Sequence, residues 1–179
     1  MELDRAIKSR KSAKHFSDGK PDWRDIIECV DSMKHAPMAG NVFSLKVIIV
    51  DDREKIGKIA KACQQGFVSE ANYVLVVCSN ESRTVNAYGK KAKDFLRQQA
   101  GAAMENFLLK LEEKNLSTCW IGYFSEEQVK RLLKIPKDIF VEAVFPIGYA
   151  SKKTPQKGKR KANLDSVLYF NNYGNKRME

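Results

Sequence analysis

The chain has 179 residues, of which 43% are hydrophobic and 30% are charged, and its formal net charge is +10. This length suits one domain with a proper core. No stretch approaches the roughly 18 apolar residues that span a bilayer, and the charged start lacks the apolar run of a secretory signal. We therefore expect a single domain over residues 1–179, in the cytoplasm, with no membrane partner.

The cysteine pattern predicts neither disulfides nor a structural metal. The four cysteines are far apart, none belongs to a CxxC pair, and only two histidines accompany them. Such cysteines are typical of small core residues in a reducing compartment. We expect no metal site. The four are Cys29, Cys63, Cys78 and Cys119.

The positive charge is concentrated in two clusters. One lies between Arg5 and Lys20, and the other places six basic residues within Lys152–Lys161 without an acidic one. The two clusters could meet around one phosphate or form a face for a nucleic-acid duplex. The chain has no aromatic-interleaved RNP pattern and no convincing helix-turn-helix, so nucleic acid is the less favoured partner.

The first part of the chain predicts two helices, a loop and a strand. Apolar residues keep helical spacing over 3–10 and again over 23–33, after Pro21, a residue favoured at helix starts. The segment Ala36–Asn41 contains helix breakers and predicts a loop. The β-branched run Leu45–Val50 then predicts a short buried strand.

The middle of the chain predicts a helix, a buried strand and the longest helix. Apolar residues keep helical spacing over 56–63, and Tyr73–Cys78 repeats the pattern of a buried strand. Helical spacing then continues from Ala92 to Lys114. We expect this last helix to form the spine of the core.

The last third predicts short elements and an arm. Thr118–Gly122 predicts a strand that ends in glycine, and Ser125–Gln128 is a capping box that begins a short helix. Phe140–Ile147 predicts another strand. Residues 151–179 predict a C-terminal arm, and its apolar residues between 164 and 170 need a surface to cover them.

Segment 9–16 has the chemistry of an anion site. Its cations Arg10, Lys11 and Lys14 supply Coulomb attraction, and its serine hydroxyls supply short hydrogen bonds. Phosphate oxygens accept from both kinds of group. A phosphorylated ligand therefore suits this segment, and a solvated basic turn is the alternative.

Familiar catalytic motifs are absent. The chain has no GxGxxG after a strand and no GxxxxGK[ST], GxSxG or HExxH. Two histidines leave little room for a Ser/His/Asp triad. An anion site with few catalytic side chains indicates a bound cofactor that carries the reaction, so we expect no catalytic side chain.

Five groups of residues, in order along the chain, resemble the nitroreductase family of FMN-dependent oxidoreductases. The similarity spans nearly the whole chain. The groups are Ala6–Phe16, Ala36–Asn41, Glu70-Ala71 with Gln98–Ala103, Thr118–Phe124 and Pro146–Tyr149.

This resemblance implies an α+β fold, a mixed β-sheet flanked by helices, in a homodimer with FMN at the interface and terminal segments that wrap the partner. It also implies NAD(P)H as co-substrate, with hydride transferred through flavin N5 to a small acceptor such as a nitroaromatic or a quinone. Two alternatives stay open. One is another flavoprotein chemistry on the same fold, such as dehalogenation or flavin destruction, and the other, less favoured, is a basic nucleic-acid-binding module.

The resemblance assigns roles at the phosphate end of the flavin. Arg10, Lys11 and Ser12 match residues that hold the phosphate and the ribityl chain. Lys14 matches a cation near the pyrimidine ring, where positive charge favours the reduced flavin. A basic residue of the C-terminal arm, Lys159 or Arg160, matches one that returns to the phosphate.

The resemblance also assigns contacts around the flavin ring. Ile121 and Gly122 match a turn whose backbone reaches flavin N5, and Gln65, or alternatively Gln64, matches a position that bonds the ring edge. A loop from the other subunit lines the ring. That loop consists of Pro37, Met38, Ala39 and Asn41.

The chain departs from the family pattern on the substrate side. Met38 stands where a serine is usual, and Val42–Leu45 replaces the usual Gln-Pro-Trp. Met38 and Phe43 near the ring would make the substrate pocket more apolar. The alternative is that both side chains pack in the core or in the interface.

Overall fold

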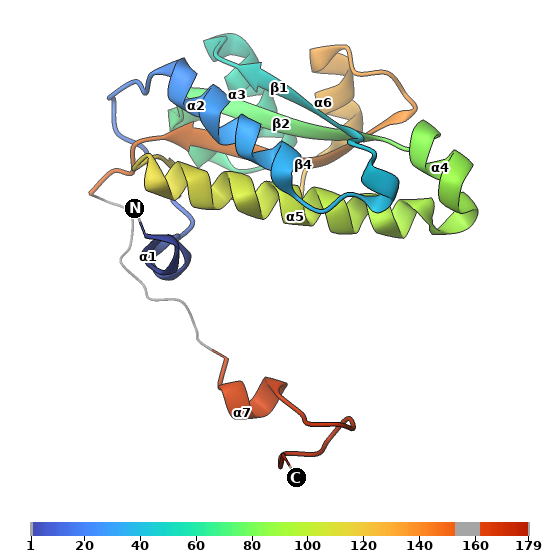
Figure 1. Ribbon diagram of the computed structural model, residues 1–179. Coiled ribbons are helices and arrows are strands. Elements are labelled where there is room, and N and C mark those ends of the chain that lie inside the picture. The colour runs from blue at the N-terminus through green and yellow to red at the C-terminus, as the bar shows by residue number, and fades with distance from the viewer. Residues whose placement is uncertain (1, 153–161, 179) are drawn as a thin grey trace.

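The computed structural model describes residues 2–152 and 162–178 (Figure 1). Its centre is a four-stranded sheet in the order β1-β2-β4-β3, and all pairings between these strands are antiparallel. An isolated parallel bridge joins Ser12 to Thr118 beside β3. The strands are β1 (Leu45–Val50), β2 (Tyr73–Asn80), β3 (Ser117–Thr118) and β4 (Ile139–Gly148).

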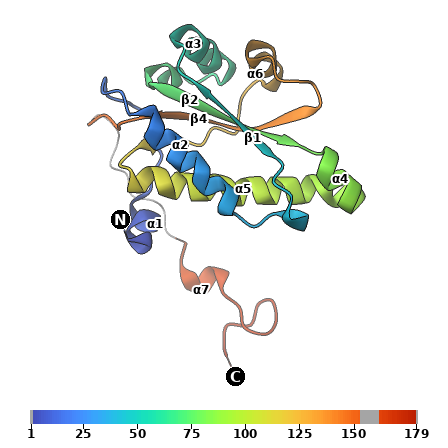
Figure 2. The ribbon, with the colours of Figure 1, turned by 45° about the horizontal axis from the view of Figure 1, so that its top comes forward.

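The two faces of the sheet are covered by different helices, which confirms the predicted α+β class (Figure 2). One pair, α2 and α5, covers one face, and the other pair, α3 and α6, covers the opposite face. These four helices are α2 (Trp23–Asp31), α3 (Arg53–Ala62), α5 (Ala92–Glu113) and α6 (Glu126–Leu133).

Strand β2 explains why the sheet has two cores. Leu75 and Val77 pack with α2 and α5, whereas Val74 and Val76 pack with α3 and α6. Successive side chains of a strand point to opposite faces, so a strand buried on both faces has a continuous apolar sequence. The predicted buried strand at Tyr73–Cys78 is therefore confirmed.

Strand β1 has the predicted bounds, but it is not a fully buried strand. It lies at an edge of the sheet and, within the described residues, pairs with β2 alone. An edge strand is covered on one side only, so Lys46 and Ile49 stay exposed. Val50, by contrast, is buried against α3.

The predicted strand at Thr118–Gly122 is shorter than expected. Only Ser117 and Thr118 belong to β3, and the chain then leaves the ladder until Ile121. Ile121 and Val144 exchange two backbone hydrogen bonds of 3.0 Å. The predicted capping box is not formed, because the Ser125 side chain makes no capping bond at the start of α6 and the Ser125 amide donates to the Ala62 carbonyl instead.

The remaining α-helices lie at the ends of the molecule (Figure 1). The sequence did not predict α4, which packs on α5. Residues 162–178 lie apart from the sheet in both views, and the side chains of Leu164 and Val167 are 65% and 62% exposed (Figures 1 and 2). The α-helices are α1 (Leu3–Ser9), α4 (Ser82–Tyr88) and α7 (Leu164–Val167), and the 3-10 helices are Ser32–His35, Ala39–Asn41, Gly66–Glu70 and Gly89–Lys91.

None of the helices within residues 2–152 and 162–178 is long and apolar enough to cross a membrane. All four cysteines are buried as free thiols.

Candidate functional site

The basic segment after α1 is held along the edge of the sheet. The Ala13 amide donates a 2.9 Å hydrogen bond to the carbonyl of Thr118, and Ser12 forms the parallel bridge with the same residue. Ala13 is almost completely buried. Because the segment pairs with β3, it is not a solvated turn: its backbone is fixed, and its side chains have defined directions.

Two further contacts fix the C-terminal end of this segment. Glu70 Oε2 accepts a 3.1 Å hydrogen bond from the Phe16 amide, and Glu70 Oε1 lies 3.4 Å from Nδ1 of His15. The Phe16 ring packs over Gly148, where an added Cβ would lie 3.0 Å from the ring. Sheet and carboxylate together therefore hold the anion segment at both ends.

Three side chains of the segment act on the thiol of Cys119. Burial raises the pKa of that thiol, while a hydrogen bond from Ser12 and the positive charges of Lys14 and Arg10 oppose the rise. The three residues alternate with Lys11 and Ala13, as neighbours on one face of an extended chain do. Arg10, Ser12 and Lys14 therefore share one side of the segment, whereas Lys11 is not among the charges acting on the thiol.

The positive charges of Arg10 and Lys14 are only weakly neutralised by carboxylates of the described residues. The Arg10 Nε lies 4.0 Å from Oε1 of Glu105, at the limit of an ion pair. The Lys14 ammonium lies 6.0 Å from the centre of the Phe67 ring, and no carboxylate partner of Lys14 is found in the described part of the chain. Two fixed cations of this kind attract an anion.

The turn after Cys119 has open space at Gly122. Ile121 is buried and pairs with Val144, but Gly122 is exposed, and a Cβ added to it would meet no atom within 4 Å. The Ser125 amide donates to the Ala62 carbonyl at 2.8 Å and so joins this turn to the end of α3. Gln65, three residues after Ala62, immediately precedes the 3-10 helix that contains Phe67.

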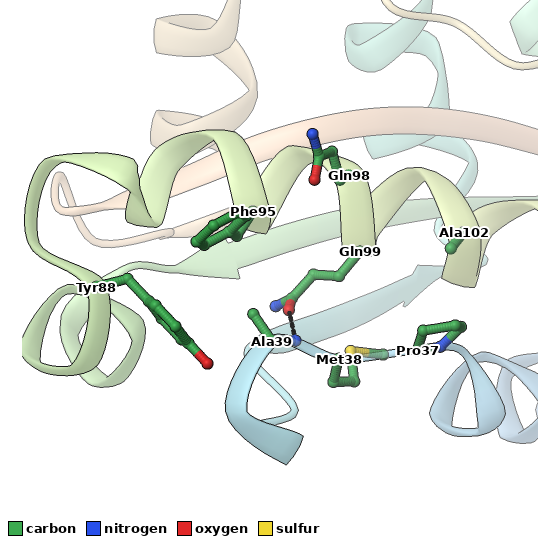
Figure 3. Close-up of a pocket in the computed structure, with 8 residues that line it drawn as sticks. All are labelled: Pro37, Met38, Ala39, Tyr88, Phe95, Gln98, Gln99 and Ala102. Atoms are coloured by element: carbon green, nitrogen blue, oxygen red, sulfur yellow. Dashed lines mark hydrogen bonds between the residues drawn. The ribbon is translucent and has the colours of Figure 1, made fainter. Parts of the chain in front are cut away.

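The loop Pro37–Asn41 lies on another side of α5. The Ala39 amide donates a 3.0 Å hydrogen bond to Gln99 Oε1 (Figure 3). Arg10, by contrast, faces Glu105. Six residues of helix correspond to roughly 9 Å of rise and roughly 120° of rotation. The structure therefore does not bring this loop to Arg10, Ser12 and Lys14 within one protomer.

A cavity of about 520 Å³ opens between this loop, α4 and α5 (Figure 3). The Tyr88 and Phe95 rings contact edge to face in its wall, with centres 5.1 Å apart. The hydroxyl of Tyr88 comes so close to Gly40 that an added Cβ there would lie 3.1 Å from it. The cavity is lined by Pro37, Met38, Ala39, Tyr88, Phe95, Gln98, Gln99 and Ala102.

Comparison with known proteins gives the family. The model of the nitroreductase family matches residues 7–71 and 58–149. The chain belongs to the nitroreductase family. It is 30% identical over 148 residues to a protein of Archaeoglobus fulgidus named as an NADH dehydrogenase/NAD(P)H nitroreductase, a match that covers 80% of this chain and 82% of that one. The predicted resemblance and the predicted class of oxidoreductase are confirmed.

Solved structures agree on the nitroreductase fold. A nitroreductase family protein from Clostridium novyi NT is 28% identical, with a TM-score of 0.78, over 98% of this chain and 96% of that chain. An iodotyrosine deiodinase solved with FMN and 3-iodo-L-tyrosine is 22% identical, with a TM-score of 0.81, over 96% of this chain and 100% of that chain. The second likeness concerns the fold alone.

One further residue beside the cation segment bears on flavin binding. The hydroxyl oxygen Oγ1 of Thr118 is buried without a hydrogen-bond partner in the described residues. It belongs to the residue that pairs with Ser12, so an unpaired polar atom lies beside the cation cluster. Cations, a serine hydroxyl, an unpaired hydroxyl and open space over Gly122 fit a phosphorylated, hydroxyl-rich cofactor such as FMN.

Sequence reasoning missed part of the site and placed part outside the described residues. Thr118 was assigned to a strand and to a group resembling the family, but to no contact with the cofactor. The cavity wall formed by Phe95 and Gln99 was not predicted; the Gln98–Ala103 group, already noted for its likeness to the family, was the available signal. Lys159 and Arg160 lie outside the residues that the structure describes.

Proposed function

We propose that this chain is an FMN-dependent NAD(P)H oxidoreductase that reduces a small acceptor such as a nitroaromatic or a quinone. The observation that carries the proposal is the edge of the sheet where Ser12 pairs with Thr118, whose hydroxyl is unpaired, and where the positive charges of Arg10 and Lys14 act on the neighbouring Cys119 thiol. Family membership supports it, and so does the FMN bound in the structurally similar iodotyrosine deiodinase.

The chain's own residues would hold FMN from two directions. Arg10 and Ser12 would bind the phosphate end, and Lys14 would place its positive charge beside the pyrimidine edge. The open backbone at Gly122 would let the ring approach closely, with Gln65 at its edge. When bound, FMN supplies the capacity to accept and donate hydride. Lys11, Ile121 and the basic pair Lys159 and Arg160 are proposed as further contacts.

We infer that the site is completed by a second copy of the chain. The loop of Pro37, Met38, Ala39 and Asn41 lies away from the cation cluster in one protomer, as a loop that serves the partner's flavin would. The apolar side chains of Leu164 and Val167 are exposed, and we expect a second copy of the chain to cover them. A homodimer formed by one domain per chain, with residues 151–179 as an arm, meets both requirements.

The proposal is tested first by flavin content and affinity. Purified protein should be yellow or take up FMN with quenching of flavin fluorescence, and FMN should raise the melting temperature. NADH or NADPH consumption should then depend on added nitrobenzene or menadione. A colourless protein whose melting temperature does not respond to FMN contradicts the proposal.

A second candidate, reductive dehalogenation, is favoured by one observation. The structurally similar iodotyrosine deiodinase was solved with 3-iodo-L-tyrosine. Release of iodide from 3-iodo-L-tyrosine by the reduced, FMN-loaded protein, faster than reduction of nitrobenzene or menadione, would make dehalogenation the main activity. Nucleic-acid binding would instead show as a steeply salt-dependent affinity for a duplex.

A further inference from the structure

A second cavity, of about 370 Å³, lies between α5 and the paired ends of β2 and β4. The apolar part of its wall contains Leu96, Met104 and Trp120. The Trp120 ring packs edge to face on Phe145, with centres 5.5 Å apart, yet the residue is 40% exposed. An indole that is fixed on one side and open on the other suits contact with an apolar group. None of the residues that line this cavity is among those proposed to hold FMN.

A β-bulge places the carboxylate of Glu142 in the wall of this cavity. The register between β2 and β4 shifts between Val77 and Cys78, and Glu142 is left without a partner on β2. Bulges of this kind redirect a side chain. The Ser79 hydroxyl donates to Oε1 of Glu142, whereas Oε2 makes no hydrogen bond within the described residues. The half-buried carboxylate is therefore fixed in direction and has one free oxygen.

The other carboxylates of the cavity are already neutralised by lysines. Glu81 lies 3.9 Å from the ammonium of Lys93, and Glu126 lies 2.7 Å from the ammonium of Lys130. Oε1 of Glu126 also accepts a 3.1 Å hydrogen bond from a backbone amide of β4. These pairs leave Glu142 as the carboxylate of the cavity that a ligand cation can neutralise.

Arg97 supplies the opposite charge from the helix. It lines the same cavity at an exposed position of α5, and among the described residues it forms no ion pair with a carboxylate. A guanidinium binds a carboxylate through two parallel hydrogen bonds. The strand and the helix therefore offer one negative and one positive group to a ligand that carries both charges.

We propose that this cavity binds a zwitterionic amino acid with an apolar side chain. The ammonium of the ligand donates to Glu142, its carboxylate accepts from Arg97, and its side chain lies against Trp120. A ligand with a single charge leaves one of the two groups without a partner, and an unpaired charge away from water is costly. An amino acid such as leucine has no group for a reduced flavin to reduce, so it is not the acceptor of the proposed reaction.

The test titrates the FMN-saturated protein with L-leucine by isothermal titration calorimetry. Isoamylamine and 4-methylpentanoate each keep the apolar chain and one of the two charges, so L-leucine should bind at least tenfold more tightly than either. In NMR spectra the indole N–H signal of Trp120 should shift with L-leucine, and that of Trp23, on α2, should not. Absence of L-leucine binding, or equal affinity for the three ligands, overturns the inference.

Substitution of the two charged groups tests their roles. Glu142→Gln keeps an oxygen for the Ser79 hydroxyl but removes the charge, and Arg97→Gln removes the guanidinium. Each should raise the L-leucine dissociation constant about tenfold or more. Glu127→Gln and Arg131→Gln, both at exposed positions of α6, are the matched controls and should leave it unchanged. An L-leucine affinity that is the same in all four variants contradicts the proposed site.

Gly101→Leu keeps the test decisive if Glu142→Gln fails to fold. Gly101 lines the cavity, and a Cβ added to it would meet no atom within 4 Å, so a larger side chain extends into the cavity without a clash at the backbone. This variant should weaken L-leucine binding tenfold or more, while Gly57→Leu, at an equally open position of α3, should not. Unchanged L-leucine affinity in Gly101→Leu overturns the inference. FMN content, measured on the same samples, tests the proposed function separately.

Discussion

The carboxylate of Glu70 holds the backbone amide of Phe16 at 3.1 Å, and so joins the 3-10 helix after α3 to the end of the cation segment. Replacing Glu70 by alanine removes the acceptor and should lower the free energy of unfolding by about 1 kcal/mol. Because the segment then loses one of its anchors, the FMN dissociation constant should rise several-fold.

Glu70→Gln is the matched control for this anchor. Glutamine keeps an oxygen that accepts from Phe16, so urea unfolding and fluorescence titration with FMN should give values near those of the parent protein. If Glu70→Gln and Glu70→Ala behave alike, the charge of Glu70, and not its hydrogen bond to Phe16, is what matters.

Arg10 and Lys8 provide a direct test of where the phosphate binds. The Arg10 side chain is 23% exposed and acts on the Cys119 thiol, whereas Lys8 is exposed and pairs with Asp4 at 2.6 Å. Loss of a charge-assisted hydrogen bond to phosphate is expected to cost about 1.5–3 kcal/mol. Arg10→Ala should therefore raise the FMN dissociation constant more than tenfold, and Lys8→Ala less than twofold, in fluorescence titrations. Equal effects would show that the phosphate lies elsewhere.

Gly148 is the position where a single methyl group should disturb the site. An added Cβ would lie 3.0 Å from the Phe16 ring and 3.3 Å from Oδ1 of Asn72. Overpacking of this kind costs about 1–3 kcal/mol, so Gly148→Ala should lower the urea midpoint and weaken FMN binding. Gly57, inside α3, has open space around its Cβ position, and Gly57→Ala should stabilise the protein by up to about 1 kcal/mol. A stabilising Gly148→Ala would contradict the close packing of Phe16.

Local patterns predicted most of the sheet and its main helices. Strand β1 has the bounds that its β-branched sequence predicts. The long helix α5 begins at Ala92, where the helical spacing of apolar residues also begins. Helix α4 was missed because its sequence has no apolar stripe; its end is held by tertiary contact, with Tyr88 packed edge to face on Phe95. A helix stabilised by its neighbours leaves little trace in local propensity.

The candidate site was predictable in its residue types but not in its pairings. The cations Arg10 and Lys14 were identified from their chemistry and from the family resemblance. The register that sets Ser12 beside Thr118 joins segments far apart in the sequence. The Gln99 amide is likewise oriented by Ala39, 60 residues away. Contacts of this range depend on the packed sheet and helices, which no local pattern contains.

The short helix α7 tests the proposed homodimer. The side chains of Leu164 and Val167 are 65% and 62% exposed, and covering them against a partner should supply association free energy. The double variant Leu164→Ser with Val167→Ser should raise the dimer dissociation constant about tenfold or more, measured by sedimentation equilibrium. Asp165→Asn, on the same helix, is the control and should leave it unchanged. A dimer unaffected by the double variant would show that this arm does not join the interface.

The buried thiol of Cys63 should make the protein less stable in alkaline solution. Its side chain is completely buried, and burial raises the pKa of the thiol from 9.0 to about 11. Between these values the unfolded chain releases a proton that the folded chain retains, so the unfolded state is favoured as pH rises from 9 towards 11. The contribution of one such group is at most about 1.4 kcal/mol per pH unit. Cys63→Ala removes this contribution. In urea unfolding, the free energy of unfolding of the variant should therefore decline less across this pH window than that of the parent protein. The smaller side chain should also cause a loss of stability that does not depend on pH. Parallel declines in the two proteins would mean that the Cys63 thiol titrates alike in the folded and unfolded states.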